Sequence, residues 1–376
     1  MQNNHLLNLP NQTSLTLWRY PQQAVDSALQ AWDSADVLLA KKFIEQSPLT
    51  TSPAIINDQF GAISCQLAEF TPLIYQDSKV SQLATLANFS LNGLPIQADQ
   101  FTSQLNQVVN QAVYLIKIPK NLDYLEAILA HLHSNAADDL KLIASAKANH
   151  INKSVVKLFN RYFSQVDVSL AEKKSRTISA SIKQKSPYSS FNPLQQWQAP
   201  SGLTFSNAAN VFSRSSLDIG AAFMLEHLPN VSGKQVIDLA CGNGVLGVHL
   251  LTQHPQSMIF SDDCYQAIQS AKINVEQNFP DLSGLTQFAW QDCLTEQTAQ
   301  SADIIICNPP FHQQHTITDH IAKQMFSDAH RVLKPAGELY IVGNRHLGYH
   351  QLLSNLFGQC SVIASNAKFV IIKAIK

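Results

Sequence analysis

The chain has 376 residues, of which 45% are hydrophobic and 14% charged, enough for two domains with sizeable buried cores. The net charge of −1 excludes a uniformly basic or acidic protein, and no apolar run of 18 residues is present to span a membrane. The first residues lack the features of a secretory signal, and the six cysteines form no CxxC pair. We expect a cytoplasmic protein with reduced cysteines and no metal site.

The charge is unevenly distributed along the chain. Residues 141–186 contain 10 Lys and Arg against 2 Asp and Glu, whereas residues 1–140 contain 6 against 12. A basic segment in an otherwise acidic region is typical of a surface that contacts nucleic acid, although lysines that only solvate a linker are the alternative. We expect seven residues to contact RNA or DNA: Lys147, Lys153, Lys157, Arg161, Lys173, Lys174 and Arg176.

The sequence of the first half of the chain resembles a degenerate copy of the second half. Residues 54–63 align with residues 237–246 at an offset of 183, and four later segments align in the same order at offsets from 185 to 198. Strand and helix signals that repeat in order indicate a duplicated domain. We predict two tandem Rossmann-like α/β domains, each with a mostly parallel sheet covered by helices on both faces.

The first copy lacks several residues of a nucleotide-binding loop. Four of its positions differ from the second copy, with Ile55, Gln59, Ser64 and Ile118 in place of Asp238, Gly242, Gly247 and Asn308. Side chains at glycine positions block the approach of the backbone to a ligand. We predict that the first domain keeps the fold, takes no cofactor and binds RNA, and a purely structural role is the alternative.

A segment rich in Pro, Ser and Gln at residues 187–200 predicts a linker between a first domain at 1–186 and a second at 201–376. Soon after it, Leu217-Asp218-Ile219-Gly220 opens an amphipathic helix. Asp218 and Gly220 either cap and pack this helix or contact a cofactor.

A nucleotide-binding loop follows the first strand of the second domain. The strand contains Asp238 and leads through Cys241, Gly242, Asn243 and Gly244 into a GxGxxG pattern that opens a helix. We expect these residues to bind a cofactor. Asp238 lies inside the strand, where it could meet a positively charged group such as an amino-acid ammonium.

The next two strands each end in a carboxylate. One ends in Asp262 and Asp263, and we favour Asp262 for both hydroxyls of a ribose, with capping of the following helix as the alternative. The other strand ends just before Asp292, at a position that would flank an adenine. We expect Asp292 to accept a hydrogen bond from the adenine amino group.

Asn308-Pro309-Pro310-Phe311 follows an apolar run that predicts a buried parallel strand. The two prolines stiffen the turn, so the Asn308 amide oxygen and the Pro309 carbonyl remain available as acceptors beside an aromatic ring. This set suits a planar ring that carries an exocyclic amine. We expect these four residues to be catalytic, with Asn308 also near the cofactor, and a simple strand-ending turn is the alternative.

These motifs together resemble those of class I S-adenosylmethionine-dependent methyltransferases that modify exocyclic amines. The Phe-Ser-Arg at 212–214, the Leu-Asp-Ile-Gly at 217–220 and the degenerate first copy narrow the resemblance to bacterial ribosomal RNA (guanine-N2)-methyltransferases. Residues 308–315 and 337–347 are most similar to the large-subunit (23S) members of that family.

The resemblance implies two tandem class I methyltransferase folds, S-adenosylmethionine as cofactor, and a guanine of 23S rRNA as substrate of a monomeric enzyme. It also makes His312, His315, Asn344 and Arg345 candidates for substrate contact. Several alternatives remain: methylation of 16S rRNA guanine, adenine-N6 methylation of RNA or DNA, glutamine methylation in proteins, a dehydrogenase, and a non-enzymatic RNA-binding assembly factor.

Overall fold

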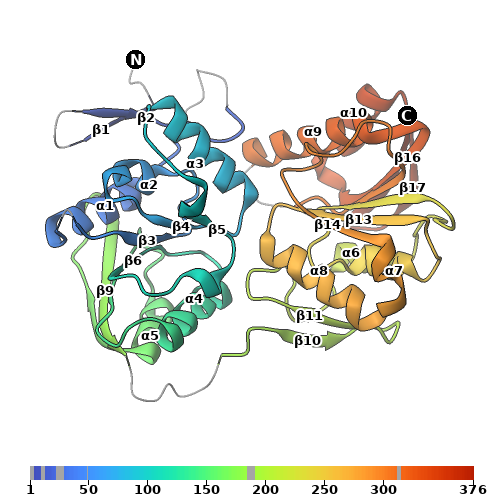
Figure 1. The fold of residues 1–376 in the computed structure, drawn as a ribbon. Coiled ribbons are helices and arrows are strands. Elements are labelled where there is room, and N and C mark those ends of the chain that lie inside the picture. Colours follow the sequence, from blue (N-terminus) through green and yellow to red (C-terminus); the bar gives the residue numbers. More distant parts are fainter. Residues whose placement is uncertain (1–3, 10–12, 23–28, 49, 184–190, 311–314) are drawn as a thin grey trace. The chain divides into compact units, whose positions relative to one another are not determined.

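The computed structural model describes residues 4–9, 13–22, 29–48, 50–183, 191–310 and 315–376, without the side chains of residues 315–319. The chain divides into two compact units, Met1–Asn192 and Pro193–Lys376, which we call the first and the second module (Figure 1). Within the described parts of the chain, no helix is long and apolar enough to cross a membrane.

The first module contains, in chain order, β1 (Leu6–Asn8), β2 (Ser14–Thr16), α1 (Ser34–Gln46), β3 (Pro53–Ile56), α2 (Ala62–Gln66), β4 (Leu73–Tyr75), α3 (Lys79–Leu91), β5 (Phe101–Thr102), β6 (Val113–Lys117), α4 (Leu122–Asn135), β7 (Lys141–Lys147), α5 (Lys153–Tyr162), β8 (Phe163–Val168) and β9 (Ser175–Lys183).

The second module contains β10 (Gln195–Gln198), β11 (Thr204–Asn207), α6 (Ile219–Leu225), β12 (Gln235–Leu239), α7 (Val245–Leu251), β13 (Ser257–Asp262), α8 (Tyr265–Asn278), β14 (Thr286–Trp290), β15 (Ala302–Cys307), α9 (His315–Val332), β16 (Leu333–Asn344), α10 (Tyr349–Phe357), β17 (Gln359–Ser365) and β18 (Phe369–Ile375).

Both modules have the same sheet. The strand orders are β5-β4-β3-β6-β7-β9-β8 and β14-β13-β12-β15-β16-β18-β17. The first five strands of each order pair in parallel and the last two pairings are antiparallel. The central strands bury almost all their side chains, as parallel strands covered on both faces do. The prediction of a duplicated, Rossmann-like α/β fold is confirmed.

Helices cover both faces of each sheet (Figure 1). In the first module, α4 and α5 share a core with one face, and α1 and α2 with the other. In the second module, α6, α7 and α8 pack on one face, and α9 and α10 on the other. Helix α5 shows why the sequence folds so: Val155, Leu158, Phe159 and Tyr162 are buried at helical spacing, with lysines on the opposite face.

The segment between the modules differs in part from the predicted linker at 187–200. Strand β10 lies inside that range and pairs with β11 in a hairpin. Trp197 stacks on Phe205 across this hairpin, with ring centroids 4.9 Å apart. This packing makes the last residues of the predicted linker part of the second module.

Candidate active site

The candidate site lies at the carboxyl edge of the second sheet. Strand β12 pairs with β13 on one side and with β15 on the other, so the chain changes direction across the sheet at β12. Open α/β sheets bind ligands at such a switch point. The predicted residues Asp238 and Asp262 lie within the last two positions of β12 and β13. Asp292 lies two residues beyond β14, and Asn308 directly follows β15. The fold therefore brings these four residues together at the carboxyl edge of the second sheet.

Asn308 presents an amide oxygen without a partner. Its Nδ2 atom donates a hydrogen bond to Asp218 Oδ2 at 3.2 Å. Its Oδ1 atom is buried and accepts no hydrogen bond from any residue that the structure describes. A buried acceptor left in this state is costly unless a ligand or water satisfies it. The arrangement suits a substrate that donates an N–H to Oδ1.

Asp218 and Gly220 shape the space around this amide. Asp218 caps helix α6, and its Oδ2 atom accepts the backbone N–H of Ala221 at 2.9 Å. A β-carbon on Gly220 would lie 3.0 Å from Asp218 Oδ2 and 3.5 Å from Asn308 Oδ1. Asp218 therefore caps the helix, which is one of the two roles expected for it, and Gly220 has no side chain to press on the Asn308 amide.

Asp238 holds the nucleotide loop against its strand. It is buried, and its Oδ2 atom accepts the backbone N–H of Gly247 at 2.9 Å. Burial, assisted by the charge of Asp262, raises the pKa of Asp238 to about 7. A β-carbon on Gly247 would lie 2.4 Å from the Phe260 ring, so only glycine permits this close approach of helix α7 to β13.

The loop offers backbone rather than side chains to a ligand. Apart from its chain neighbours, Gly242 has no heavy atom of the described residues within 4 Å of its missing β-carbon, and Gly244 precedes helix α7 with a φ of 78°. The Asn243 side chain is used inside the loop, where Oδ1 accepts the Val245 N–H at 3.1 Å. Cys241 is buried, and burial raises the pKa of its thiol.

Asp262 ties the loop to β13. Its Oδ2 atom accepts the Gly242 N–H and its Oδ1 atom accepts the Cys264 N–H, each at 2.8 Å. A carboxylate oxygen has lone pairs for more than one hydrogen bond. The cap residue of α8 is Cys264, whose own side chain makes no capping hydrogen bond, so Asp262 contacts the start of that helix through the Cys264 N–H.

Asp292 has a partner that the sequence did not reveal. It is buried, and its Oδ2 atom accepts a hydrogen bond from Gln324 Nε2 of α9 at 2.7 Å. Asn344, a predicted substrate contact at the end of β16, has a buried Oδ1 atom with no partner among the described residues. Arg345 is exposed. A second amide acceptor therefore lies on the strand next to that of Asn308.

Some of the residues predicted to contact the substrate lie outside the part of the chain that the structure describes. Phe311 and His312 lie outside the described residues, as does the side chain of His315. Pro309 is buried and Pro310 is exposed. Among the described residues, no group of His, Cys, Asp and Glu could hold a metal ion. A cavity of about 200 Å³ lies in the first module, and no predicted site residue lines it.

The strand registers identify the counterpart of Asn308 in the first module. With β3 and β12 aligned at the offset of 183, Leu115 pairs with β3 where Ile306 pairs with β12. The residue two places after Leu115 is Lys117, so the prediction of Ile118 is wrong by one residue. A slip of one residue keeps an apolar run and a proline aligned, although it turns each side chain to the opposite face of the sheet.

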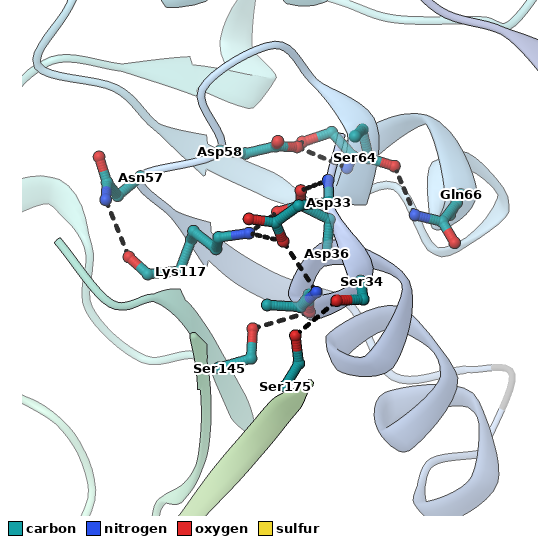
Figure 2. A network of polar contacts seen from close by, with 12 residues as sticks. Asp33, Ser34, Asp36, Asn57, Asp58, Ser64, Gln66, Lys117, Ser145 and Ser175 are labelled. Carbon is teal, nitrogen blue, oxygen red and sulfur yellow. Dashed lines mark hydrogen bonds and ion pairs between the residues drawn. The ribbon is translucent and has the colours of Figure 1, made fainter. Parts of the chain in front are cut away.

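Lys117 directs its ammonium group toward the start of helix α1 (Figure 2). Its Nζ atom lies 2.7 Å from Asp33 Oδ1 and 2.5 Å from Asp36 Oδ1. Asp33 caps α1 as Asp218 caps α6. Both modules therefore contain a contact between a capping aspartate and the residue that corresponds to Asn308, but in the first module this contact is an ion pair.

The charges of this ion pair are strongly coupled. Burial favours a neutral lysine, but Asp36 and Asp33 outweigh burial and raise the pKa of Lys117. Burial acts to raise the pKa of Asp33 as well, but Lys117 holds it below its usual value. For Asp36, burial dominates and the pKa is raised.

In the first module, a carboxylate at a different sequence position makes the contact that Asp238 makes in the second module. Asp58 is buried, and its Oδ2 atom accepts the backbone N–H and the hydroxyl of Ser64, each at 2.8 Å (Figure 2). Ser64 corresponds to Gly247. Burial, followed by the charge of Asp36, raises the pKa of Asp58 to about 6. Comparison by position missed this residue, because Ile55 stands where the second module has Asp238.

The seven basic residues divide into two groups. Two arginines are partly buried and engaged: Arg161 forms an ion pair with Glu126, and Arg176 Nε donates to the Ser169 carbonyl at 2.7 Å. Five lysines are exposed: Lys147, Lys153, Lys157, Lys173 and Lys174. The arginines are therefore weaker candidates for RNA contact than the sequence indicated.

Comparisons with known proteins cover both modules. The RLMG N-terminal domain family matches residues 5–184, and the Methyltransferase small domain family matches residues 202–373. The chain is 45% identical over 370 residues to the ribosomal RNA large subunit methyltransferase G of Aeromonas salmonicida, which covers 96% of this chain and 97% of that protein. It is 43% identical over 365 residues to the protein of the same name from Klebsiella pneumoniae, with 96% of each covered.

A solved structure supports the fold of the whole chain. The 16S rRNA N2 methyltransferase of T. thermophilus, in complex with AdoMet and guanosine, superposes with a TM-score of 0.74 over 100% of this chain and 98% of that one, at 21% identity. The fold, the nucleotide loop and these relatives define the class of protein, an S-adenosylmethionine-dependent rRNA methyltransferase. Within that class, the chain belongs to the ribosomal RNA large subunit methyltransferase G family.

Proposed function

We propose that this enzyme methylates the exocyclic N2 amine of a guanine in large-subunit (23S) rRNA. The relatives named for the large subunit match 96% of the chain. The observation that carries the chemical part is the buried, unpartnered Oδ1 atom of Asn308 at the switch point of the sheet. An amine substrate would satisfy that acceptor.

The chemistry of the amine explains why two acceptors are needed. A guanine N2 amine is a poor nucleophile, because its lone pair is delocalised into the ring. Asn308 Oδ1 and the Pro309 carbonyl each accept one N–H, which draws the nitrogen toward sp³ geometry and directs its lone pair out of the ring plane. S-adenosylmethionine, when bound, supplies an electrophilic methyl group. Positioning and hydrogen bonding then provide most of the rate enhancement.

The remaining residues of the turn hold the base in place in this proposal. Pro310 stiffens the turn, and Phe311 stacks on the guanine ring. A strong general base is unnecessary, because the methylated amine is acidic and loses a proton to water. A stacked guanine must first leave its helix at a cost of a few kcal/mol, which RNA contacts elsewhere on the enzyme offset.

We assign the cofactor to the carboxyl edges of β12, β13 and β14. Asp238 faces the amino-acid end of S-adenosylmethionine, and Asp262 accepts hydrogen bonds from the ribose hydroxyls. Asp292 accepts a hydrogen bond from the adenine amine, and Gln324 holds the Asp292 carboxylate in place. The half-buried backbone at Gly242, which carries no side chain, receives the ligand closely. Four further residues shape or border this site: Cys241, Asn243, Gly244 and Gly220.

We assign RNA binding to the first module through its five exposed lysines. Lys147 ends β7, and the pairing of β7 with β9 places it beside Lys174 at the carboxyl edge of the sheet. Lys153 and Lys157 lie on the exposed face of α5. Exposed cations bind phosphate without sequence preference, so they position the RNA while the second module selects the base.

The first module takes no cofactor in this proposal. Its counterpart of the amine-binding position holds the Lys117 ion pair, and the counterpart of Gly247 carries the Ser64 side chain. We also propose that the protein is a monomer in the cytoplasm, where its six cysteines, all free in the structure, stay reduced. Light scattering of the purified protein tests the monomer.

Two other substrates remain as weaker candidates. Adenine N6 would use the same acceptor pair, and guanine N2 of 16S rRNA would use the same chemistry. The relatives named for the large subunit favour 23S over 16S rRNA. An assembly factor without activity would have no use for the open acceptor at Asn308.

The variant Asn308→Ala tests the proposal. With purified protein, S-adenosylmethionine and rRNA from cells that lack the enzyme, methyl transfer should fall by about a hundredfold or more, because a directed hydrogen bond in a transition state is typically worth that much. Cofactor affinity, measured by calorimetry, should stay within about threefold, or about 0.6 kcal/mol. An unchanged rate would contradict the proposed role.

A further inference from the structure

We propose that Asp218 is a positioning residue, which fixes the Asn308 amide with its oxygen toward the substrate. The inference rests on the proposed function, since it gives Asn308 Oδ1 its role as an acceptor. It assigns to Asp218 a part in methyl transfer that neither helix capping nor cofactor contact includes.

The geometry makes the orientation of the amide unambiguous. Asp218 Oδ2 already accepts the Ala221 N–H, and the side of the Asn308 amide that faces this acceptor is the nitrogen. If the amide turned over, Asn308 Oδ1 would face another acceptor and the substrate would meet Nδ2. Two acceptors at 3.2 Å repel each other, and the contact thus favours the orientation that leaves the oxygen for an amine.

Asp218 is itself held in place. The same Oδ2 atom accepts the Ala221 backbone N–H at the first turn of α6, 2.9 Å away. This bond anchors the carboxylate to a helix whose side chains Ala221 and Met224 are buried in the core of the second module. The helix start therefore supplies a fixed reference point for the amide on the neighbouring strand end.

The first module contains the same connection in a different chemical form. Asp33 caps α1, and its Oδ1 atom accepts both the Ala35 backbone N–H at 2.8 Å and a hydrogen bond from Lys117 Nζ at 2.7 Å (Figure 2). One carboxylate oxygen thus joins a helix start to the last residue of β6 in the first module and to the residue after β15 in the second. The position of that residue is set by the capping aspartate in each case, although only Asn308 offers an acceptor.

Two substitutions separate positioning from capping. Serine caps helices as well as aspartate does, but its shorter side chain in Asp218→Ser cannot also reach Asn308. Asparagine in Asp218→Asn places an amide oxygen where Oδ2 lies, which can accept from both Ala221 and Asn308. If Asp218 acts through Asn308, the serine variant loses rate and the asparagine variant retains it.

The experiment measures single-turnover methylation of 23S rRNA at saturating S-adenosylmethionine, with cofactor affinity and melting temperature as independent readouts. We expect Asp218→Ser to be slower than wild type by about tenfold or more and Asp218→Asn to stay within about threefold. Cofactor affinity should be unchanged in both. In an Asn308→Ala background, Asp218→Ser should cost no further rate, because the group it positions is absent.

Each other result overturns the inference in a recognisable way. A fully active Asp218→Ser variant reduces Asp218 to a helix cap, and weak cofactor binding by Asp218→Asn makes it a cofactor contact. If Asp218→Ser does not fold, the inference depends on Asp218→Asn, and a rate loss there contradicts it. Failure of the proposed function is distinct, because wild type would then yield a nucleoside other than N2-methylguanosine.

Discussion

Gly220 lies beside the amide of Asn308 and has no side chain to fill the space there. A β-carbon at this position would come within 3.0 Å of Asp218 Oδ2 and 3.3 Å of the Phe369 ring. We expect Gly220→Ala to lower the rate of methyl transfer by about tenfold to a hundredfold, since small displacements of positioning groups have effects of that size. Single-turnover kinetics with rRNA provide the measurement.

A matched control exists in the same module. Gly284 has open space around its missing β-carbon, so Gly284→Ala adds the same methyl group without a contact. That variant should keep the rate of wild type. Equal rates for Gly220→Ala and wild type would show that the space beside Asn308 is not needed for the substrate.

Asp58 makes the stability of the first module depend on pH. Its pKa is about 6 in the folded protein against 3.8 for the unperturbed group. The folded state thus holds the proton more tightly, and unfolding free energy falls as pH rises from about 4 to about 6. We expect Asp58→Asn, which keeps an acceptor for Ser64, to remove this part of the pH dependence.

Denaturant unfolding at several pH values measures this effect. As pH rises across that window, the unfolding free energy of wild type should fall relative to that of Asp58→Asn, by an amount on the order of 2–3 kcal/mol. A constant difference from pH 4 to pH 7 would contradict a buried carboxyl with a raised pKa.

At the scale of single residues, the sequence predicted the position of polar side chains that lie at the ends of strands. Asp238, Asp262, Asp292 and Asn308 each lie where their strand pattern predicts. Their partners were not predictable, because the contact of Gln324 with Asp292 joins residues that only the packing of α9 brings together. The role of Asp218 beside Asn308 depends on tertiary structure in the same way.

At the scale of elements, the Lys117 ion pair fastens helix α1 to the carboxyl end of β6. In Lys117→Met the buried carboxyl of Asp36 and the half-buried carboxylate of Asp33 would lose their cation. Removing one partner of a buried ion pair costs about 3–5 kcal/mol. We therefore expect a clear loss of stability of the first module in denaturant unfolding.

Lys120 serves as the control for this change, because it lies three residues further along and is exposed. Lys120→Met should alter unfolding free energy by no more than about 0.5 kcal/mol. Cofactor should bind both variants with the affinity and single-site stoichiometry of wild type. A second bound S-adenosylmethionine per chain would contradict the assignment of the cofactor to one module.

The error in the counterpart of Asn308 has a cause at this scale too. Apolar runs in parallel strands lack the alternation that fixes which side chain faces which side. The repeat was therefore visible from the sequence, but its register after β6 became clear only from the pairing of Leu115 with β3. The hairpin of β10 and β11 was missed because its composition is that of a linker.

The exposed lysines of α5 provide a test of RNA binding by this element. We expect Lys153→Glu combined with Lys157→Glu to weaken binding of 23S rRNA fragments by about tenfold or more at moderate salt, and to reduce the salt dependence of affinity. Filter binding at several salt concentrations measures both quantities. Lys272→Glu, at an exposed position of α8 in the second module, is the control.

The outcome distinguishes two roles for the first module. Weaker RNA binding with normal cofactor affinity supports a module that positions the substrate. Unchanged RNA affinity in the double variant, with the same salt dependence, would leave the first module with a structural role.

At the scale of the whole molecule, one fold occurs twice with different chemistry at the same edge of the sheet. The second module places a buried, unpartnered amide acceptor and the Gly242 backbone there. The first module has the Lys117 ion pair in place of the amide acceptor and the Ser64 side chain in place of Gly247. The account thus assigns base and cofactor to one module and the RNA backbone to the other.

The identity of the methylated nucleoside tests this account most directly. Purified enzyme, S-adenosylmethionine and separated 23S and 16S rRNA from cells that lack the enzyme are incubated, and the RNA is digested and analysed by mass spectrometry. The account predicts N2-methylguanosine in 23S rRNA alone. N6-methyladenosine, or methylation confined to 16S rRNA, would contradict it.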